Sequence, residues 1–254
     1  TAEIGGPGNQ NYGGRIRGAG GMRKQGNGRF VLTGDNDYTG PTDVNQGRLI
    51  VNGRLSGTSR VDVRSGAALG GTGTIDGFTA IEAGGTHAPG GSPGLQTFTA
   101  GLDYGSSAVF EWELSANTAQ TGDRGTLFDA VDVTGGNLSI DSAAAFNLVF
   151  DSPLADTTAS TVDWTDAFWD SDRSWTVIDF SGGGTSSGLF TLGSIGNDIN
   201  GIALSTARPN ASFSVVRNGD DVDLTYAAVP EPGTLALAAL AAAAALGCSR
   251  RLIH

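Results

Sequence analysis

Apolar and polar residues alternate along short stretches in the first half of the chain. The alternation is clear in residues 48–52 (Arg-Leu-Ile-Val-Asn) and in residues 59–63 (Ser-Arg-Val-Asp-Val). A period of two is the pattern of a β-strand, because successive side chains of a strand point to opposite faces. We therefore predict that one apolar set faces the interior: Leu49, Val51, Val61 and Val63.

The strand-like stretches recur at a nearly constant spacing. Gly47, Gly66, Gly84 and Gly105 mark successive bends at almost equal separations. Glycine suits such bends because it adopts positive φ angles at little cost. A period near twenty is typical of a solenoid, whose stacked coils bury an apolar column that no single coil could bury. The pattern predicts an all-β fold, a single-stranded parallel β-helix.

The second half continues with strand-like runs at looser spacing. These runs cover residues 128–133, 146–150, 175–180, 213–216 and 222–226, and we interpret them as degenerate coils and a C-terminal β cap. An insertion rich in aromatic residues lies among them. We expect Trp164, Phe168, Trp169 and Trp175 to close the core, and the alternative for Trp164, Trp169 and Trp175 is stacking against a glycan.

The composition changes abruptly at residue 229. Val229-Pro230-Glu231-Pro232 precedes an Ala/Leu run, residues 234–248, and Arg250 and Arg251 follow. The run predicts a hydrophobic helix of about 22 Å, short of the roughly 30 Å hydrocarbon core. Such a helix is a marginal membrane anchor, or alternatively a buried core helix. In an anchor, Arg250 and Arg251 would act as a membrane-stop signal and leave residues 1 to 229 outside.

These patterns divide the chain into four parts. We expect a Gly-rich segment or incomplete first coil (1–27), solenoid repeats (28–114), degenerate coils with a cap (115–228) and the tail (229–254).

The tail resembles the PEP-CTERM sorting domain of Gram-negative bacteria. The resemblance covers Val229 to Arg251: a Pro-Glu-Pro motif, an apolar helix and an arginine pair, in that order. It implies recognition by an exosortase-type processing enzyme, cleavage near the motif, transient contact with the inner membrane, and delivery to the cell surface or extracellular matrix.

The first half resembles the autotransporter-associated β-strand repeat. Residues 30–42 (Phe-Val-Leu-Thr-Gly-Asp-Asn-Asp-Tyr-Thr-Gly-Pro-Thr) and 44–47 carry the likeness, as do 69–75 and 88–94. Asp43 and His87 depart from the pattern, where Thr and Leu are more usual. The resemblance implies a right-handed parallel β-helix that serves as an adhesin-like scaffold, with exopolysaccharide as a possible partner.

The net charge of the chain argues against one class of partner, nucleic acids. The net charge is −11 and the pI is near 4.4, so most of the surface would repel a nucleic acid. One basic cluster near the start is interpreted as a solvated face, and contact with an anionic glycan or lipid headgroup is the alternative: Arg15, Arg17, Arg23, Lys24 and Arg29.

Few chemistries fit the remaining residues. The one cysteine, Cys248, excludes an internal disulfide framework, and the histidines are His87 and His254. We expect His87 to pack between coils rather than to bind a metal, and we expect no catalytic residue and no cofactor. The rival hypothesis is a polysaccharide lyase or hydrolase, since parallel β-helices also carry such enzymes.

Two acidic groups are the candidates for that rival enzyme. They are Asp129 and Asp132 with Arg124, and Asp220, Asp221 and Asp223; we interpret them as solvated turn and strand residues. Weak calcium binding stays open at two acidic turns, 35–37 and 219–221, which lack the spacing of known calcium loops.

Overall fold

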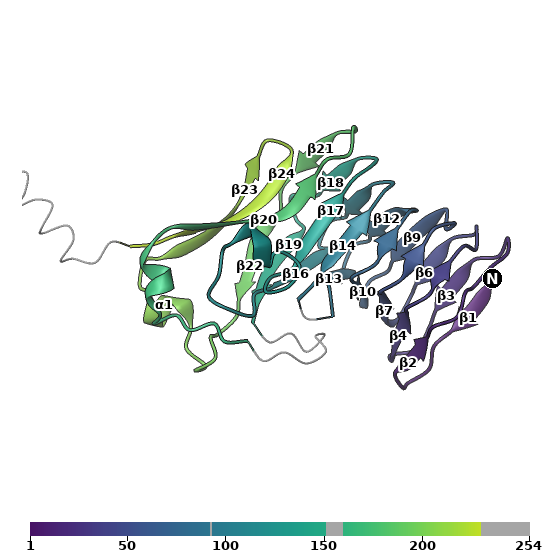
Figure 1. Cartoon of the computed structure of the whole chain (residues 1–254), viewed down its shortest axis with the longest axis horizontal. Helices are drawn as coiled ribbons and strands as arrows, with labels where there is room; N and C mark the ends of the chain where they lie inside the picture. The colour runs from purple at the N-terminus through teal and green to yellow at the C-terminus, as the bar shows by residue number, and fades with distance from the viewer. Residues whose placement is uncertain (92, 151–159, 230–254) are drawn as a thin grey trace, which may run out of the picture.

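The computed structural model describes residues 1–91, 93–150 and 160–229, and it shows an elongated stack of β coils (Figure 1). Successive strands enter three different sheets in turn, so each coil adds one strand to each sheet, except that the first and the last coil add none in parallel to the third sheet. All neighbouring strands within the coils pair in parallel. The predicted β-solenoid is confirmed, and its right-handed sense stays a prediction.

Sheets A and B each contain eight strands. Sheet A has the order β1 (Ala2–Ile4), β3 (Met22–Lys24), β6 (Thr42–Val44), β9 (Arg60–Val63), β12 (Phe78–Ile81), β15 (Leu102–Tyr104), β18 (Leu138–Ile140) and β21 (Ser186–Gly188). Sheet B has the order β2 (Gln10–Tyr12), β4 (Arg29–Leu32), β7 (Gly47–Val51), β10 (Ala67–Gly71), β13 (Thr86–Pro89), β16 (Val109–Glu113), β19 (Ala145–Val149) and β22 (Thr191–Ile195).

Sheet C differs because its last two strands are antiparallel. Its order is β5 (Asp35–Asn36), β8 (Arg54–Leu55), β11 (Thr74–Ile75), β14 (Leu95–Phe98), β17 (Ala130–Val133), β20 (Arg173–Phe180), β24 (Asp221–Ala227) and β23 (Ser212–Asn218). The helical elements are short: η1 (Thr121–Asp123), η2 (Ala167–Asp170) and α1 (Leu204–Ala207).

The core is a column of stacked apolar side chains, as the alternation predicted. Leu49, Val51, Val61 and Val63 are all fully buried. Leu49 pairs in register with Leu69, and Leu69 pairs with His87. Because equivalent residues of successive coils stack directly, the buried surface is continuous along the solenoid.

Glycines make the bend between sheets A and B in the early coils. Gly47, Gly66 and Gly84 have φ angles of +63°, +75° and +74°, in the left-handed region that the predicted bends require. Gly105 also lies at such a bend, between β15 and β16, but it is not the residue with positive φ there. The positive φ at this bend, 61°, belongs to Ser107, whose carbonyl accepts a hydrogen bond from the Gly84 N–H.

The parallel ladder crosses both expected divisions of the described body. β1 pairs with β3 before residue 28, and β18 pairs with β21 well after residue 114. The four limits given above therefore stay predictions about domains, while the stacking itself continues through β22.

A β hairpin and an aromatic cluster close the C-terminal end. The hairpin β23–β24 pairs antiparallel with β20 and extends sheet C, and the predicted runs 213–216 and 222–226 lie in it. Trp164 and Trp169 pack with ring centroids 4.6 Å apart, and the Tyr226 hydroxyl donates to the Trp169 carbonyl. The expectation that the aromatic insertion closes the core agrees with this packing.

The described residues include no helix that is long and apolar enough to cross a bilayer. The hydrophobic helix predicted for residues 234–248 lies outside the described residues.

Candidate functional site

The sorting motif follows closely on the last strand of the cap. β24 ends at Ala227, and the Ala228 N–H donates to the Asp172 carboxylate at 2.8 Å. Val229 is 44% exposed. The other predicted tail residues lie outside the described residues: Pro230, Glu231, Pro232, Arg250 and Arg251. The folded body thus holds the chain up to the residue before the motif.

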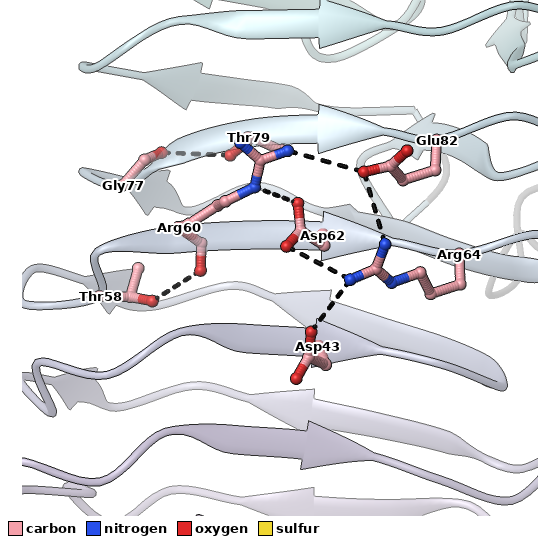
Figure 2. Close-up of polar contacts among 8 residues, drawn as sticks. All are labelled: Asp43, Thr58, Arg60, Asp62, Arg64, Gly77, Thr79 and Glu82. Carbon is pink, nitrogen blue, oxygen red and sulfur yellow. Dashed lines mark hydrogen bonds and ion pairs between the residues drawn. The ribbon is translucent and has the colours of Figure 1, made fainter.

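A network of opposite charges lies on the outer face of sheet A, across β6, β9 and β12 (Figure 2). Arg64, directly after β9, lies 3.4 Å from Asp43 on β6, and its other terminal nitrogen lies 3.5 Å from Glu82, directly after β12. Arg60 pairs with Asp62 on the same strand and lies 3.6 Å from Glu82. These five residues, the charged ladder, connect three adjacent strands.

The charged ladder continues toward the N-terminus through Arg23. This side chain lies 3.8 Å from Asp43 and 3.6 Å from Glu3. The arginine side chains stay 40–46% exposed, so water and salt screen the pairs, and the guanidinium groups are accessible to a polar ligand. Arg60 also lies over the Phe78 ring, 5.0 Å from its centroid.

The sequence analysis missed the charged ladder, although a signal for it was present. Arg23 and Asp43, and likewise Asp62 and Glu82, are separated along the chain by close to one coil length. In a solenoid, residues at that separation become neighbours on one face. The coil period therefore aligns charged residues as well as glycines and apolar residues.

The basic cluster near the start does not form one patch. Arg15 pairs with Asp37, whereas Arg23 contacts Asp43 of the charged ladder. Lys24 is fully buried, and its amine donates to the carbonyls of Gln25, Gly26 and Gln46. Burial lowers the Lys24 pKa. The interpretation of this cluster as one solvated face is therefore wrong for Lys24.

His87 is a core residue, as expected. Its Nε2 donates to the Gln96 side-chain oxygen at 2.9 Å, which leaves Nδ1 to accept from the Tyr104 hydroxyl at 2.6 Å. Desolvation by burial lowers the His87 pKa to about 4. The imidazole is neutral at pH 7 and bonded at both nitrogens, so it holds the core together rather than facing a substrate.

In the first acidic candidate, Asp129 was expected to be solvated and is buried instead. The Asp129 carboxylate accepts from the backbone N–H groups of Gly94 and Glu113, at 2.8 and 3.0 Å. Burial first, and then the Glu113 carboxylate, raise the Asp129 pKa well above its usual value. Asp132 is paired with Arg124 at 2.6 Å. Asp129 therefore fastens a loop to β16, a structural role.

The second acidic candidate is also divided among separate contacts. Asp221 accepts from the Phe180 N–H, whereas Asp223 is buried and accepts from the Asn218 amide. The solvated interpretation is thus wrong for Asp223. Within residues 1–91, 93–150 and 160–229, no group of three or more His, Cys, Asp or Glu side chains is placed to hold a metal ion.

The tryptophans proposed as glycan contacts are buried. Trp164, Trp169 and Trp175 are 0%, 0% and 1% exposed, so none has a ring face free for a sugar. The Trp175 indole N–H donates to the Thr118 carbonyl at 2.6 Å inside the cap. Glycan contact through these rings is therefore incorrect, because the solenoid end needs their bulk as a cover.

Comparison with known proteins agrees with both resemblances. Residues 22–51 match the passenger-associated-transport-repeat family, and residues 228–251 match the PEP-CTERM protein-sorting motif. The chain is 43% identical over 76 residues to an "Adhesin BmaC autotransporter" of Brucella suis biovar 1 (strain 1330), which is 30% of this chain and 2% of that protein. It is 39% identical over 79 residues to an "Extracellular serine protease" of Serratia marcescens, 31% of this chain and 7% of that protein.

The chain thus spans a small part of the length of these curated relatives. An autotransporter-type repeat on a β-solenoid, followed by a sorting motif, is typical of an exported protein. The chain carries the passenger-associated-transport repeat and the PEP-CTERM motif, which together indicate an exported cell-surface protein.

Proposed function

We propose that this chain is a non-catalytic surface or extracellular-matrix protein of a Gram-negative bacterium, sorted through its tail by an exosortase-type enzyme. The observation that carries the proposal is a parallel β ladder that ends in a closed cap and is followed at once by the sorting motif. The cap fixes the chain as far as Ala228, and the Val-Pro-Glu-Pro motif begins at the next residue, Val229. Residues 234–248 would anchor the precursor in the inner membrane, with Arg250 and Arg251 as the stop signal.

The body would act as a rigid, adhesin-like scaffold, and the charged ladder is its best surface for a polysaccharide. Adjacent strands of a sheet lie about 4.8 Å apart, so the ladder presents donors and acceptors at regular intervals. Arg60 and Arg64 supply fixed guanidinium donors that their acidic partners hold in place. A hydroxyl-rich polymer can hydrogen-bond to such a face without a deep pocket.

The test of sorting is the intact mass of the protein in the surface, medium and membrane fractions of its native host. We expect a surface or released species that ends near Pro230. Pro230→Ala together with Pro232→Ala should leave the full-length chain in the inner membrane, whereas Pro209→Ala, in an exposed turn of the body, should be processed normally. A full-length chain in the inner membrane of the unmodified host would contradict the proposal.

The test of the scaffold is binding of the host's exopolysaccharide to the purified full-length protein. Arg60→Gln with Arg64→Gln should weaken binding several-fold, whereas Arg15→Gln, which removes an exposed pair elsewhere, should not. Equal binding by both variants would exclude the charged ladder as the contact.

The rival function is polysaccharide cleavage, and the observation that favours it is the Arg124–Asp132 pair beside Asp179 on sheet C. Burial first, and then Asp221 and Asp132, raise the Asp179 pKa, as a group used for proton transfer would require. We expect no polymer cleavage by the purified protein. Cleavage that disappears in Asp132→Asn or Asp179→Asn would establish the enzyme instead.

A further inference from the structure

A pocket of about 310 Å³ opens at the capped end, between β22, α1 and β23. Its apolar wall is formed by Leu192, Ile195, Ala203, Leu204, Ala211 and Phe213. Exposed polar side chains complete the lining: Ser205, Asn210 and Ser212. Its volume is near the lower end of the roughly 300–1,000 Å³ typical of ligand pockets, so it suits a few aliphatic side chains.

The wall that α1 contributes is held in place by Arg208. This side chain donates to the carbonyls of Trp164 and Asp166, at 2.7 and 2.8 Å, and pairs with Asp170. Leu204 and Phe213, which line the pocket, are buried in the core cluster. The pocket is therefore preformed and does not require a ligand to create it.

The chain leaves the folded body beside this pocket. Ser212, which lines the pocket, is the register partner of Ala227, the last residue of β24. Paired residues of antiparallel strands lie about 5 Å apart. Ala228 packs against the core and is fixed by Asp172. The tail thus starts from a defined point about one strand spacing from the pocket.

We propose that the pocket holds Leu235 and Leu237 of the chain's own tail before the tail enters the membrane. Leu235 follows Ala228 by seven residues, which can span about 23 Å, more than the short path from Ala227 requires. A segment tethered by so short a linker reaches an effective concentration on the order of millimolar, which no free ligand matches easily. Docking covers apolar side chains that are otherwise exposed to water during export.

Docking gives the tail a protected state that precedes anchoring and processing. This purpose rests on the proposed sorting function, but the docking itself is a property of the purified chain. The tail would leave the pocket when a bilayer offers it a larger apolar environment.

Disulfide trapping in the full-length chain tests the proposal. Cys248→Ser removes the native thiol, and Ser205→Cys is combined with Leu237→Cys. Ser205 lines the pocket and is exposed, so its replacement leaves the fold intact. The matched control places Ser187→Cys, an exposed residue of β21 in sheet A, with the same Leu237→Cys.

We expect the pocket pair to form an intramolecular disulfide at least tenfold faster than the control pair. Intact mass measures the rate of disulfide formation in both. Ala211→Trp, which fills the pocket, should reduce the rate to that of the control. Equal rates for the two pairs would overturn the proposal, and disulfides only between molecules would show that a second copy occupies the pocket. Rapid trapping without tail processing in the host would leave docking standing and refute sorting, and the reverse result would refute docking alone.

Discussion

The two ends of the solenoid differ in the width and chemistry of their cores. Sheet C strands have two residues each in β5, β8 and β11, four in β14 and β17, and eight in β20. The N-terminal end is the narrow one, and its core consists mainly of aliphatic side chains such as Val61 and Ile75, with Phe30 and Tyr38 among them. The wide C-terminal end is filled mainly by aromatic side chains such as Trp112 and Phe146. Because interiors are close-packed, a wider coil needs larger side chains to avoid cavities.

Coil length changes in the same direction. The sheet A strands from β3 to β15 start at closely spaced positions: Met22, Thr42, Arg60, Phe78 and Leu102. The next two strands, β18 and β21, start only at Leu138 and Ser186, so the late coils are much longer. The additional residues supply the aromatic insertion and surface loops. The narrow end therefore depends on repetition, and the wide end on a specific set of large side chains.

The largest predicted loss of stability comes from a substitution in the aromatic core of the wide end. Trp175→Ala should lower the free energy of unfolding by about 3–5 kcal/mol, because it removes a buried indole from the cap and leaves a cavity. Ile75→Val in the narrow end should cost only about 0.5–1.5 kcal/mol. Urea denaturation followed by tryptophan fluorescence and circular dichroism measures both. Equal losses would mean that the cap does not depend on its aromatic packing.

The second effect concerns His87, where the aliphatic column changes to an aromatic one. Its folded pKa of about 4 lies below the ordinary 6.5, so between these values the unfolded chain binds more protons. Stability should therefore fall as pH drops from 6.5 toward 4, by about 3 kcal/mol at most. His87→Leu should remove this pH dependence. The substitution should also destabilise the protein, because it leaves the buried Tyr104 hydroxyl without its hydrogen-bond partner.

The unmodified protein and the His87→Leu variant are compared because buried carboxylates such as Asp129 titrate in both. The difference between their pH dependences therefore reports on the histidine alone. Unfolding free energies at pH 7 and pH 4.5 give the comparison. A parallel pH dependence in both proteins would show that His87 is not responsible.

The third prediction concerns how closely the coils of the narrow end stack at their glycine bends. At Gly47 an added Cβ would lie 2.5 Å from the carbonyl oxygens of Gly26 and Gly28 in the preceding coil, whereas at Gly66 it would meet nothing within 4 Å. Both residues have positive φ, so each Ala substitution costs roughly 1–2 kcal/mol in backbone strain. Gly47→Ala should cost more than Gly66→Ala because coils must move apart. Thermal unfolding of the pair measures it, and equal midpoints would contradict close stacking there.

The smallest effect is expected at the charged ladder. Arg64→Met should change the free energy of unfolding by about 1 kcal/mol or less, since exposed ion pairs contribute little. The difference should decrease further at high salt. Denaturation at low and high ionic strength measures it. A loss of several kcal/mol would mean that the ladder stabilises the coils rather than serving a surface role.

The sequence alone determined the coil period, the inward residues of the early coils and the sorting motif. Alternation of period two identified Leu49 and Val61 because burial on one face leaves a direct trace in the order of residues. The repeat was legible before residue 105 because coil length was nearly constant there. It was lost afterwards because insertions moved the equivalent strands β15, β18 and β21 much farther apart along the chain.

Only the tertiary structure decided which polar residues are buried and which polar residues contact one another. Lys24, Asp129 and Asp223 looked like solvated charges. Folding instead brings a carbonyl of the next coil to Lys24 and the Gly94 N–H to Asp129, and it places the Asn218 amide beside Asp223 within the terminal hairpin. The charged ladder and the pocket beside Ala227 likewise join residues from different coils. Such contacts depend on how coils pair and where insertions fold back, and neither is encoded in any local pattern of residues.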